Sequence, residues 1–210
     1  LQSELRSKTD TEVLLKIIER RDCEHALSVI DGMYAWAVWN ADTETLHLAR
    51  DPFGVKPLFV AEHDGILWFA SEIKPLLMIP GFRRTPNIEA LYHYLSFDFI
   101  PGSWTPFDGI TEVRPGSWWS IESRTGTIKH QTHNQTQRSQ DSTISREDAT
   151  EESRRLLEQA VRRQLVADVD VGVMLSGGLD SSSIAALTKE VRSDNDFHTF
   201  SIGFDDPSFD

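Results

Sequence analysis

The sequence predicts two successive folds: an α+β part built on antiparallel strands, and then an α/β part built on a parallel sheet. In the first part, short aromatic and branched runs alternate with turn residues, which is typical of antiparallel strands. A polar connection follows, and beyond it the expected order is helix, strand, loop, helix and strand, which is typical of a βαβ unit. We therefore divide the chain into residues 1–130, a connection at 131–145, and residues 146–210.

The first element is expected to be a helix. Four aliphatic residues recur at the spacing of one helical face: Val13, Leu14, Ile17 and Ile18. Thr9 and Glu12 precede this face in the pattern of a capping box, in which two side chains bond amides that the first turn leaves free. The helix is therefore expected to begin near Thr9.

The next elements are expected to be strands. Four runs carry the pattern: MYAWAVW, TLHLAR, PLFVA and ILWFAS. A helix is expected around 87–97, and then further strands in ITEVRPGSWWSIESRTGTIKH, divided at Pro115-Gly116 and at 124–126. All six tryptophans lie before position 120, so this part is predicted to hold an aromatic core.

The connection at 131–145 is rich in Gln, Ser and Thr, which is typical of an exposed segment. Beyond it we expect a charged helix over about 147–166. The run VDVGVML lacks clean alternation, which predicts a strand covered on both faces. The loop SGGLDSS, the helix IAALTKEV and the strand FHTFSIGF complete the unit. About 65 residues are too few to cover such a sheet by themselves.

Composition and charge exclude several classes of protein. The 210 residues are 39% hydrophobic and 26% charged, which excludes a wholly disordered chain. The net charge is 21 − 33 = −12, which repels phosphate backbones and anionic lipid, so we expect neither nucleic acid nor membrane as a partner. The single cysteine, Cys23, excludes an internal disulfide framework and indicates a reducing, cytoplasmic location.

The loop Ser176–Ser182, with the sequence SGGLDSS, is the strongest candidate for chemistry. It joins a buried strand to a helix, so its amides gather at the positive end of the helix dipole, where a phosphate binds well. Two glycines allow a close approach of the backbone, and no lysine follows them as in a Walker loop. Asp180 fits an anion site only if a cation such as Mg²⁺ shares it. The alternative is a simple turn with Asp180 or Ser181 as a helix cap.

The motif VGVMLSGGLDSSSIAAL resembles the pyrophosphate loop of the ATP-pyrophosphatase superfamily. It is most similar to the synthetase domain of the glutamine-hydrolysing asparagine synthetases. Two earlier segments, GMYAWAVWNADTETLHLARDPFGVKPLFV and LWFASEIKPLL, resemble the class II glutamine amidotransferase domain. The resemblance implies an N-terminal-nucleophile hydrolase fold, an antiparallel αββα sandwich, followed by an adenine-nucleotide domain. It further implies an internal fragment, truncated at both ends and inactive alone.

The resemblance also implies site residues. Seven are expected to bind ATP: Leu175, Ser176, Gly177, Gly178, Asp180, Ser181 and Ile202. Leu175 and Ile202 would contact the adenine ring, and Asp180 would contact Mg²⁺. In the first part, Asp10 of the segment TDTE is expected to receive the α-ammonium group of glutamine; the alternative is that Asp10 only complements the dipole of the helix that follows.

No catalytic residue is expected within these 210 residues. The family uses an amino-terminal cysteine as its nucleophile, and this chain does not begin with one. Cys23 follows a charged pair and is expected to pack as a small hydrophobic residue.

The activity that the resemblance implies is synthesis of asparagine from aspartate. ATP would adenylate the side-chain carboxylate of aspartate, and ammonia released from glutamine would attack the adenylate. Two alternatives stay open: a related amide- or lactam-forming synthetase that uses another carboxylate, and an amidotransferase-like scaffold without catalysis. Homodimer formation is also left open.

Three other features invite a functional interpretation but are expected to be structural. The turn from Asp51 to Leu58 places acid and base together, and we expect Arg50, Asp51 and Lys56 to pair around it. Glu72 is expected to be a helix cap or a domain contact. His130 and His133 have no carboxylate or cysteine nearby in the sequence, so a metal site is not predicted there.

Overall fold

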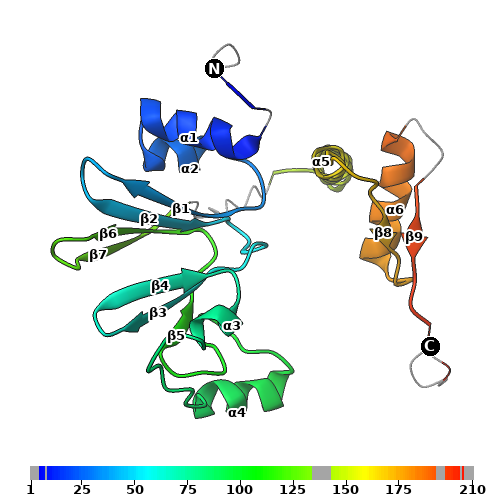
Figure 1. Ribbon diagram of the computed structural model, residues 1–210. Coiled ribbons are helices and arrows are strands. Elements are labelled where there is room, and N and C mark those ends of the chain that lie inside the picture. Colours follow the sequence, from blue (N-terminus) through cyan, green and yellow to red (C-terminus); the bar gives the residue numbers. More distant parts are fainter. Residues whose placement is uncertain (1–4, 8, 134–142, 193–196, 204, 206–210) are drawn as a thin grey trace. The chain divides into compact units, whose positions relative to one another are not determined.

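A computed structural model of the chain is shown in Figure 1. It describes residues 5–7, 9–133, 143–192, 197–203 and 205. The chain divides into two compact units, Leu1–Gln137 and Arg138–Asp210. The predicted connection at 131–145 contains the boundary between the units, and most of its middle lies outside the described residues.

The first unit begins with two helices. They are α1 (Asp10–Arg20) and α2 (Cys23–Val29). The predicted start of α1 is confirmed, since Thr9 is the N-cap and its side chain accepts a hydrogen bond from the amide of Glu12. Helix α2 was not predicted. Asp22 caps it by accepting from the amide of His25 at 2.6 Å, and Cys23, Ala26 and Leu27 are its buried residues.

Two antiparallel sheets form the centre of this unit. The first has the order β1-β2-β6-β7, with β1 (Ala35–Asn40), β2 (Thr45–Arg50), β6 (Ser117–Glu122) and β7 (Ile128–Thr132). The second has the order β4-β3-β5, with β3 (Phe59–His63), β4 (Ile66–Ala70) and β5 (Ile110–Glu112). The predicted strand pattern of residues 33–132 is therefore confirmed.

The elements of the first unit lie in layers. Figure 1 shows α1 and α2 on one side of the first sheet and the second sheet on its other side, with α3 (Ile73–Leu76) and α4 (Ile88–Phe97) beyond. The predicted helix around 87–97 is confirmed, with Asn87 as its N-cap. Glu72 occupies the N-cap position of α3, but its side chain makes no capping hydrogen bond.

The core between the two sheets is aliphatic. Its buried residues come from both sheets and the segments beside them: Leu48, Leu58, Val60, Val113 and Ile121. Trp119 packs against this cluster, whereas Trp39 and Trp104 are exposed. The prediction of an aromatic core was therefore wrong, because branched side chains fill the space between the sheets and several indole rings lie on outer faces.

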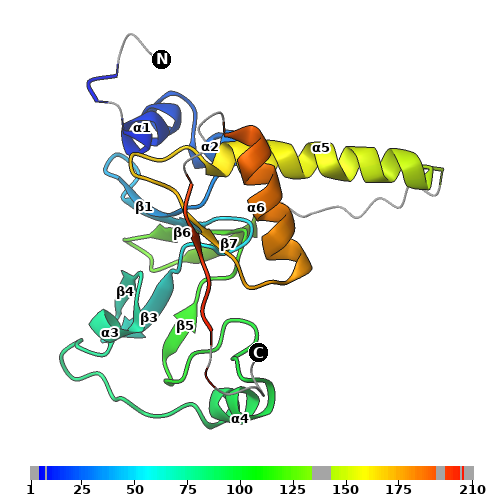
Figure 2. The ribbon, with the colours of Figure 1, turned by 90° about the vertical axis from the view of Figure 1, so that its right-hand side faces the viewer.

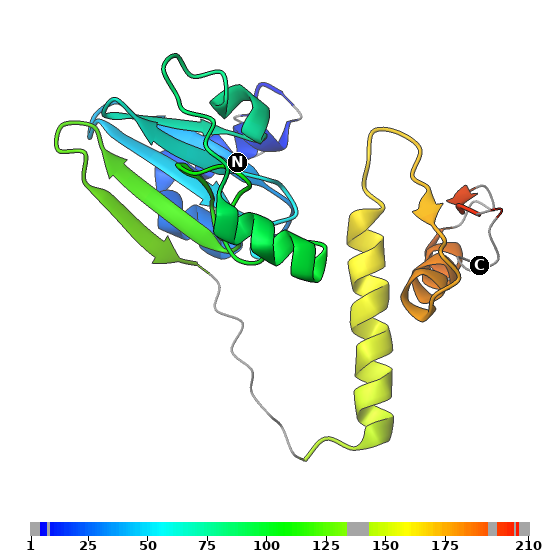
Figure 3. The same cartoon turned by 90° about the horizontal axis from the view of Figure 1, so that it is seen from below.

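The second unit is smaller and buries less. It contains α5 (Arg146–Gln164), β8 (Val173–Met174), α6 (Leu179–Val191) and β9 (Thr199–Phe200). Helix α6 packs against α5 (Figure 2), and β8 lies beside α6 (Figure 3). Strand β8 pairs with β9 in parallel. The predicted βαβ order and the helix near 147–166 are confirmed.

The predicted strand VDVGVML is shorter and more open than expected. Only Val173 and Met174 are in β8, and Met174 is 64% exposed. The described sheet has the two strands β8 and β9, and helix α6 packs against β8. Among the described residues of this unit, the buried ones are Val161, Leu187 and Thr188. In the part of the chain that the structure describes, no helix is long and apolar enough to cross a membrane.

Candidate functional site

The start of helix α1 presents Asp10 at the edge of a cavity. Glu12 holds the segment before the helix, since its carboxylate accepts from the amides of Arg6 at 2.9 Å and Ser7 at 2.7 Å. Asp10 itself is exposed, and its Oδ1 atom accepts from the amide of Thr11 at 2.7 Å. The charge of Asp10 is therefore available to a ligand while also complementing the helix dipole.

The cavity beside Asp10 has a volume of about 830 Å³. Its lining comes from α1, from the segment that leads into β1, and from the turn that follows β2. Charged, aromatic and apolar side chains share this lining, among them Asp10, Asp31, Tyr34, Trp36, Lys56 and Pro57. The cavity thus combines carboxylates, an ammonium group and apolar surface, which suits a zwitterionic amino acid.

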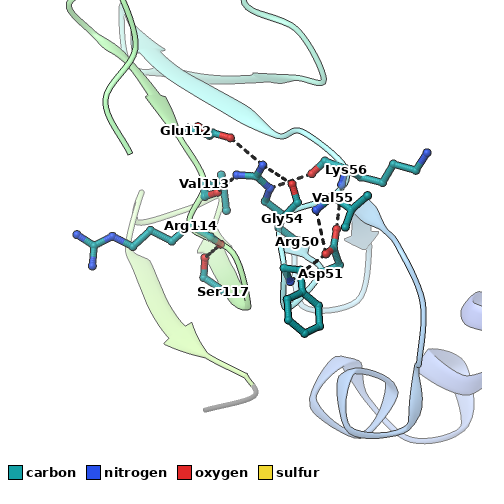
Figure 4. Close-up of polar contacts among 10 residues, drawn as sticks. Arg50, Asp51, Gly54, Val55, Lys56, Glu112, Val113, Arg114 and Ser117 are labelled. Atoms are coloured by element: carbon teal, nitrogen blue, oxygen red, sulfur yellow. Dashed lines mark hydrogen bonds and ion pairs between the residues drawn. The ribbon is translucent and has the colours of Figure 1, made fainter. Parts of the chain in front are cut away.

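The turn after β2 depends on the buried Arg50, which is 5% exposed (Figure 4). Its guanidinium donates to three backbone carbonyls: Lys56 at 2.8 Å, Gly54 at 2.8 Å and Val113 at 2.6 Å. The fourth contact is an ion pair with Glu112 Oε1 at 2.7 Å. Glu112 is the last residue of β5, and Val113 follows it. Arg50, at the end of β2, therefore connects the first sheet to the second.

Asp51 completes the turn from the other side. It is 1% exposed, and its carboxylate accepts from the amides of Phe53, Val55 and Lys56 at 3.0–3.1 Å. Burial alone would raise the pKa of Asp51, but these three N–H groups stabilise the carboxylate and hold its pKa below the ordinary value. The Asp51 amide also donates to the carbonyl of Tyr34 at 2.8 Å.

The structure corrects the predicted pairing within this turn. Arg50 pairs with Glu112, and Asp51 binds backbone amides, so the expected mutual pairing of Arg50, Asp51 and Lys56 was wrong. Arg50 and Glu112 are 62 positions apart, and no local pattern connects them. The structure also gives His133 a role that the sequence did not indicate, since its Nε2 atom hydrogen-bonds the Arg50 carbonyl at 2.9 Å.

Cys23 is buried in α2, as predicted for a small hydrophobic residue. Burial, and then the charge of Asp22, raises the pKa of its thiol to about 11. The thiol is therefore protonated at neutral pH and is a poor nucleophile.

In the second unit, the loop SGGLDSS lies between β8 and α6, as the sequence predicted. Gly177 has φ +80°, and a Cβ atom built there would meet nothing within 4 Å. Gly178 is the N-cap of α6 and offers no side chain to its amides. Ser181 holds the loop, because its hydroxyl contacts the Ser176 hydroxyl at 3.1 Å and donates to the Gly178 carbonyl at 3.2 Å. The loop is thus preshaped and open, with amides at a helix N-terminus.

The expected adenine contacts lie on neighbouring segments. The Leu175 amide donates to the carbonyl of Phe200 at 2.8 Å, and the Ser201 hydroxyl donates to the carbonyl of Leu175 at 2.7 Å. Ile202 follows directly and is 74% exposed. The structure therefore brings the ends of the two strands together beside the loop.

Asp180 lies in the first turn of α6 and is exposed. No group of three or more His, Cys, Asp or Glu side chains gathers for a metal within the described ranges, so any cation here would depend on ligands beyond one carboxylate. Mg²⁺ commonly binds through one or two carboxylates, phosphate oxygens and water, and the open loop beside Asp180 is compatible with that arrangement.

Comparison with known proteins agrees with both units. Residues 1–133 match the model of a glutamine amidotransferase domain, and residues 152–210 match the model of asparagine synthase. A solved glutamine phosphoribosylpyrophosphate amidotransferase from B. subtilis is 20% identical, with a TM-score of 0.41 over 94% of this chain and 40% of that one.

Two curated relatives come from Bacillus subtilis (strain 168). The chain is 35% identical over 206 residues to asparagine synthetase [glutamine-hydrolyzing] 1, covering 96% of this chain and 31% of the relative. It is 34% identical over 233 residues to asparagine synthetase [glutamine-hydrolyzing] 3, covering 98% of this chain and 35% of the relative. The chain thus spans about a third of the length of these relatives. With a glutamine amidotransferase match followed by an asparagine synthase match, the chain belongs to the family of glutamine-hydrolysing asparagine synthetases.

Proposed function

We propose that this chain is part of an enzyme that makes asparagine from aspartate, using ATP and ammonia from glutamine. Glutamine and water would give glutamate and ammonia at the first unit. Aspartate and ATP would give an aspartyl-adenylate and pyrophosphate at the second, and ammonia would displace AMP to form the amide. The family membership supports the overall reaction, and the SGGLDSS loop carries the AMP-forming assignment.

The loop supports this chemistry through its backbone. A lysine-free loop at a helix N-terminus can stabilise the charge of departing pyrophosphate with amides, since Gly177 leaves room and Gly178 leaves the first amides of α6 free. Mg²⁺ would neutralise phosphate charge, with Asp180 as its protein ligand. Ser176 and Ser181 would add neutral donors, and Leu175 with Ile202 would contact the adenine.

The first unit would supply the ammonia. Asp10 would bind the α-ammonium group of glutamine at the edge of the 830 Å³ cavity. We also propose that the intact first domain has the N-terminal-nucleophile hydrolase fold, in line with the layered antiparallel sheets seen here, and that the domain boundaries are 1–130 and 146–210. A cytoplasmic location is proposed from the lone cysteine.

The test uses the full-length enzyme that contains this sequence. We expect aspartate- and Mg²⁺-dependent exchange between ATP and pyrophosphate, and we expect Asp180→Ala to abolish it. Asp168→Ala, an exposed aspartate outside the loop, is the matched control and should leave the exchange intact. Exchange that persists in Asp180→Ala would remove the proposed role of this residue.

Three further results would decide the substrates and whether the protein is a catalyst. Exchange that requires another carboxylate in place of aspartate would favour a related amide- or lactam-forming synthetase. For the glutamine site, Asp10→Asn should raise the KM for glutamine and leave ammonia-dependent synthesis unchanged. Absence of both exchange and glutamine hydrolysis would instead favour a scaffold without catalysis.

A further inference from the structure

In the turn after β2, two side chains bind the backbone of Lys56, a residue of the cavity lining. The amide of Lys56 donates to Asp51 Oδ2 at 3.0 Å, and its carbonyl accepts from Arg50 Nε at 2.8 Å. Both polar backbone groups of this one residue are therefore bound by side chains that precede it by five and six positions. Lys56 itself is exposed, so buried packing does not hold it in place.

The same two residues also contact a second part of the lining, through the backbone of Asp51, and the opposite sheet, through the side chain of Arg50. The amide of Asp51 donates to the carbonyl of Tyr34, which also lines the cavity. Arg50 binds Glu112 and the carbonyl of Val113 at the end of the second sheet. Figure 4 shows the contacts of Arg50 with Glu112 and Val113 meeting at the guanidinium. The position of Lys56 is thus fixed relative to Tyr34 and to both sheets at once.

We propose that Arg50 and Asp51 are positioning residues for the glutamine site, because they hold Lys56, a residue of the lining of the Asp10 cavity, through its backbone. This proposal rests on the proposed function of that cavity. Neither residue needs to touch the substrate, since both side chains are buried and occupied by backbone groups. Displacing a site wall by about 1 Å can cost as much as a hundredfold in activity.

The position of Lys56 in the chain explains why side chains must hold its backbone. Lys56 and Pro57 lie between β2 and β3 and belong to neither strand, so no ladder hydrogen bonds fix them. A carboxylate that accepts several amides and a guanidinium that donates to several carbonyls make the stronger class of hydrogen bond. The turn therefore holds this part of the cavity lining by side-chain hydrogen bonds in place of the bonds between strands.

The experiment compares glutamine-dependent and ammonia-dependent synthesis in the full-length enzyme. We expect Asp51→Asn to raise the KM for glutamine by roughly tenfold, to change kcat less, and to leave ammonia-dependent synthesis unchanged. The matched control is Glu44→Gln, the same acid-to-amide change at an exposed ion pair with Arg124 in the same unit, and it should leave the KM for glutamine unchanged.

A milder variant keeps the test decisive if Asp51→Asn does not fold. Glu112 is partly exposed, and Glu112→Gln weakens the anchoring of Arg50 while leaving its bonds to carbonyls. We expect it to raise the KM for glutamine by roughly threefold, the same direction at smaller size. In either folded variant, an unchanged KM would overturn the positioning role, and so would an equal loss of both activities.

Amide hydrogen exchange gives a readout that does not depend on activity. In Asp51→Asn, or in Glu112→Gln if the former does not fold, exchange should accelerate in the peptide covering residues 52–58, and in Glu44→Gln it should not. If the wild-type enzyme releases no ammonia from glutamine, the proposed function fails. If it does and the exchange of this peptide stays unchanged in the variant, only the positioning role fails.

Discussion

At the scale of single residues, the turn that contains Arg50 and Asp51 is held together by two buried charged side chains. Each side chain is surrounded by partners of opposite polarity, so that the cost of removing charge from water is offset by several strong hydrogen bonds. Removing one partner would leave the other buried without compensation. The turn is therefore sensitive to changes in shape as well as charge.

The glycine within this turn provides a matched comparison. Gly54 has φ +65°, and a Cβ atom there would lie 2.8 Å from Pro115 Cγ and 3.1 Å from the Arg50 guanidinium. Gly126 has φ +66° with nothing within 4 Å of such an atom. We expect Gly126→Ala to cost about 1 kcal/mol of unfolding free energy from backbone strain, and Gly54→Ala about 3 kcal/mol because it also overpacks the turn. Urea denaturation followed by tryptophan fluorescence measures both; equal losses would contradict the close approach.

The ionisation of Asp51 makes stability depend on pH. Its pKa is lowered in the folded chain, so the unfolded chain binds the proton more readily at low pH. The stabilisation is present above roughly pH 4, the ordinary range of an aspartate, and is lost as the pH falls through the lowered folded pKa. We expect the difference in unfolding free energy between wild type and Asp51→Asn to be largest near neutral pH and to shrink in acid. A difference that grew in acid would contradict this assignment.

At the scale of elements, most of the strand and helix pattern could be predicted because it is written in neighbouring residues. Alternation, turn residues and caps act over a few positions, which is why α1, α4 and the strands β1 to β4 lie where the sequence placed them. Helix α2 was missed because it has seven residues, too few for a clear period. The sequence feature that could have indicated α2 is Asp22, a residue type that favours the N-cap position, where its side chain accepts from the amide of His25.

The short parallel pair β8–β9 depends on one small residue. At Gly172, a Cβ atom would lie 2.6 Å from the ring of Phe200 and 3.1 Å from the carbonyl of His198, which accepts the amide of Val173. We expect Gly172→Ala to weaken this pairing by about 1–2 kcal/mol.

Amide exchange of the peptide covering residues 171–176 measures the effect, because tryptophan is absent from this part of the sequence. Gly203→Ala is the control, since a Cβ atom there would meet nothing within 4 Å. Unchanged exchange in Gly172→Ala would show that the ring of Phe200 and the chain around it can move aside at no cost.

At the scale of the whole molecule, the two units differ in how much they bury. The first unit has two clusters of buried hydrophobic residues, one between the sheets and one beneath α3. Within the described part of the second unit, only Val161, Leu187 and Thr188 are buried, although its loop is already ordered by Ser176 and Ser181. In this unit, therefore, hydrogen bonds within the loop, and not a buried core, set the shape of the loop.

The sequence by itself determined most of the order of elements, apart from α2, and the position of the SGGLDSS loop between a strand and a helix and of Asp10 at the start of a helix. These features follow from periodicity, caps and glycines, which act between neighbours along the chain. Only the tertiary structure decided that Arg50 pairs with Glu112 and that Asp51 and Arg50 bind both backbone groups of Lys56 beside the cavity. The Arg50–Glu112 pair joins two different sheets, and its partners are brought together by packing in space, which leaves no pattern in adjacent residues. The bonds to Lys56 are short in sequence, but they depend on the direction of two buried side chains, which the order of residues does not give.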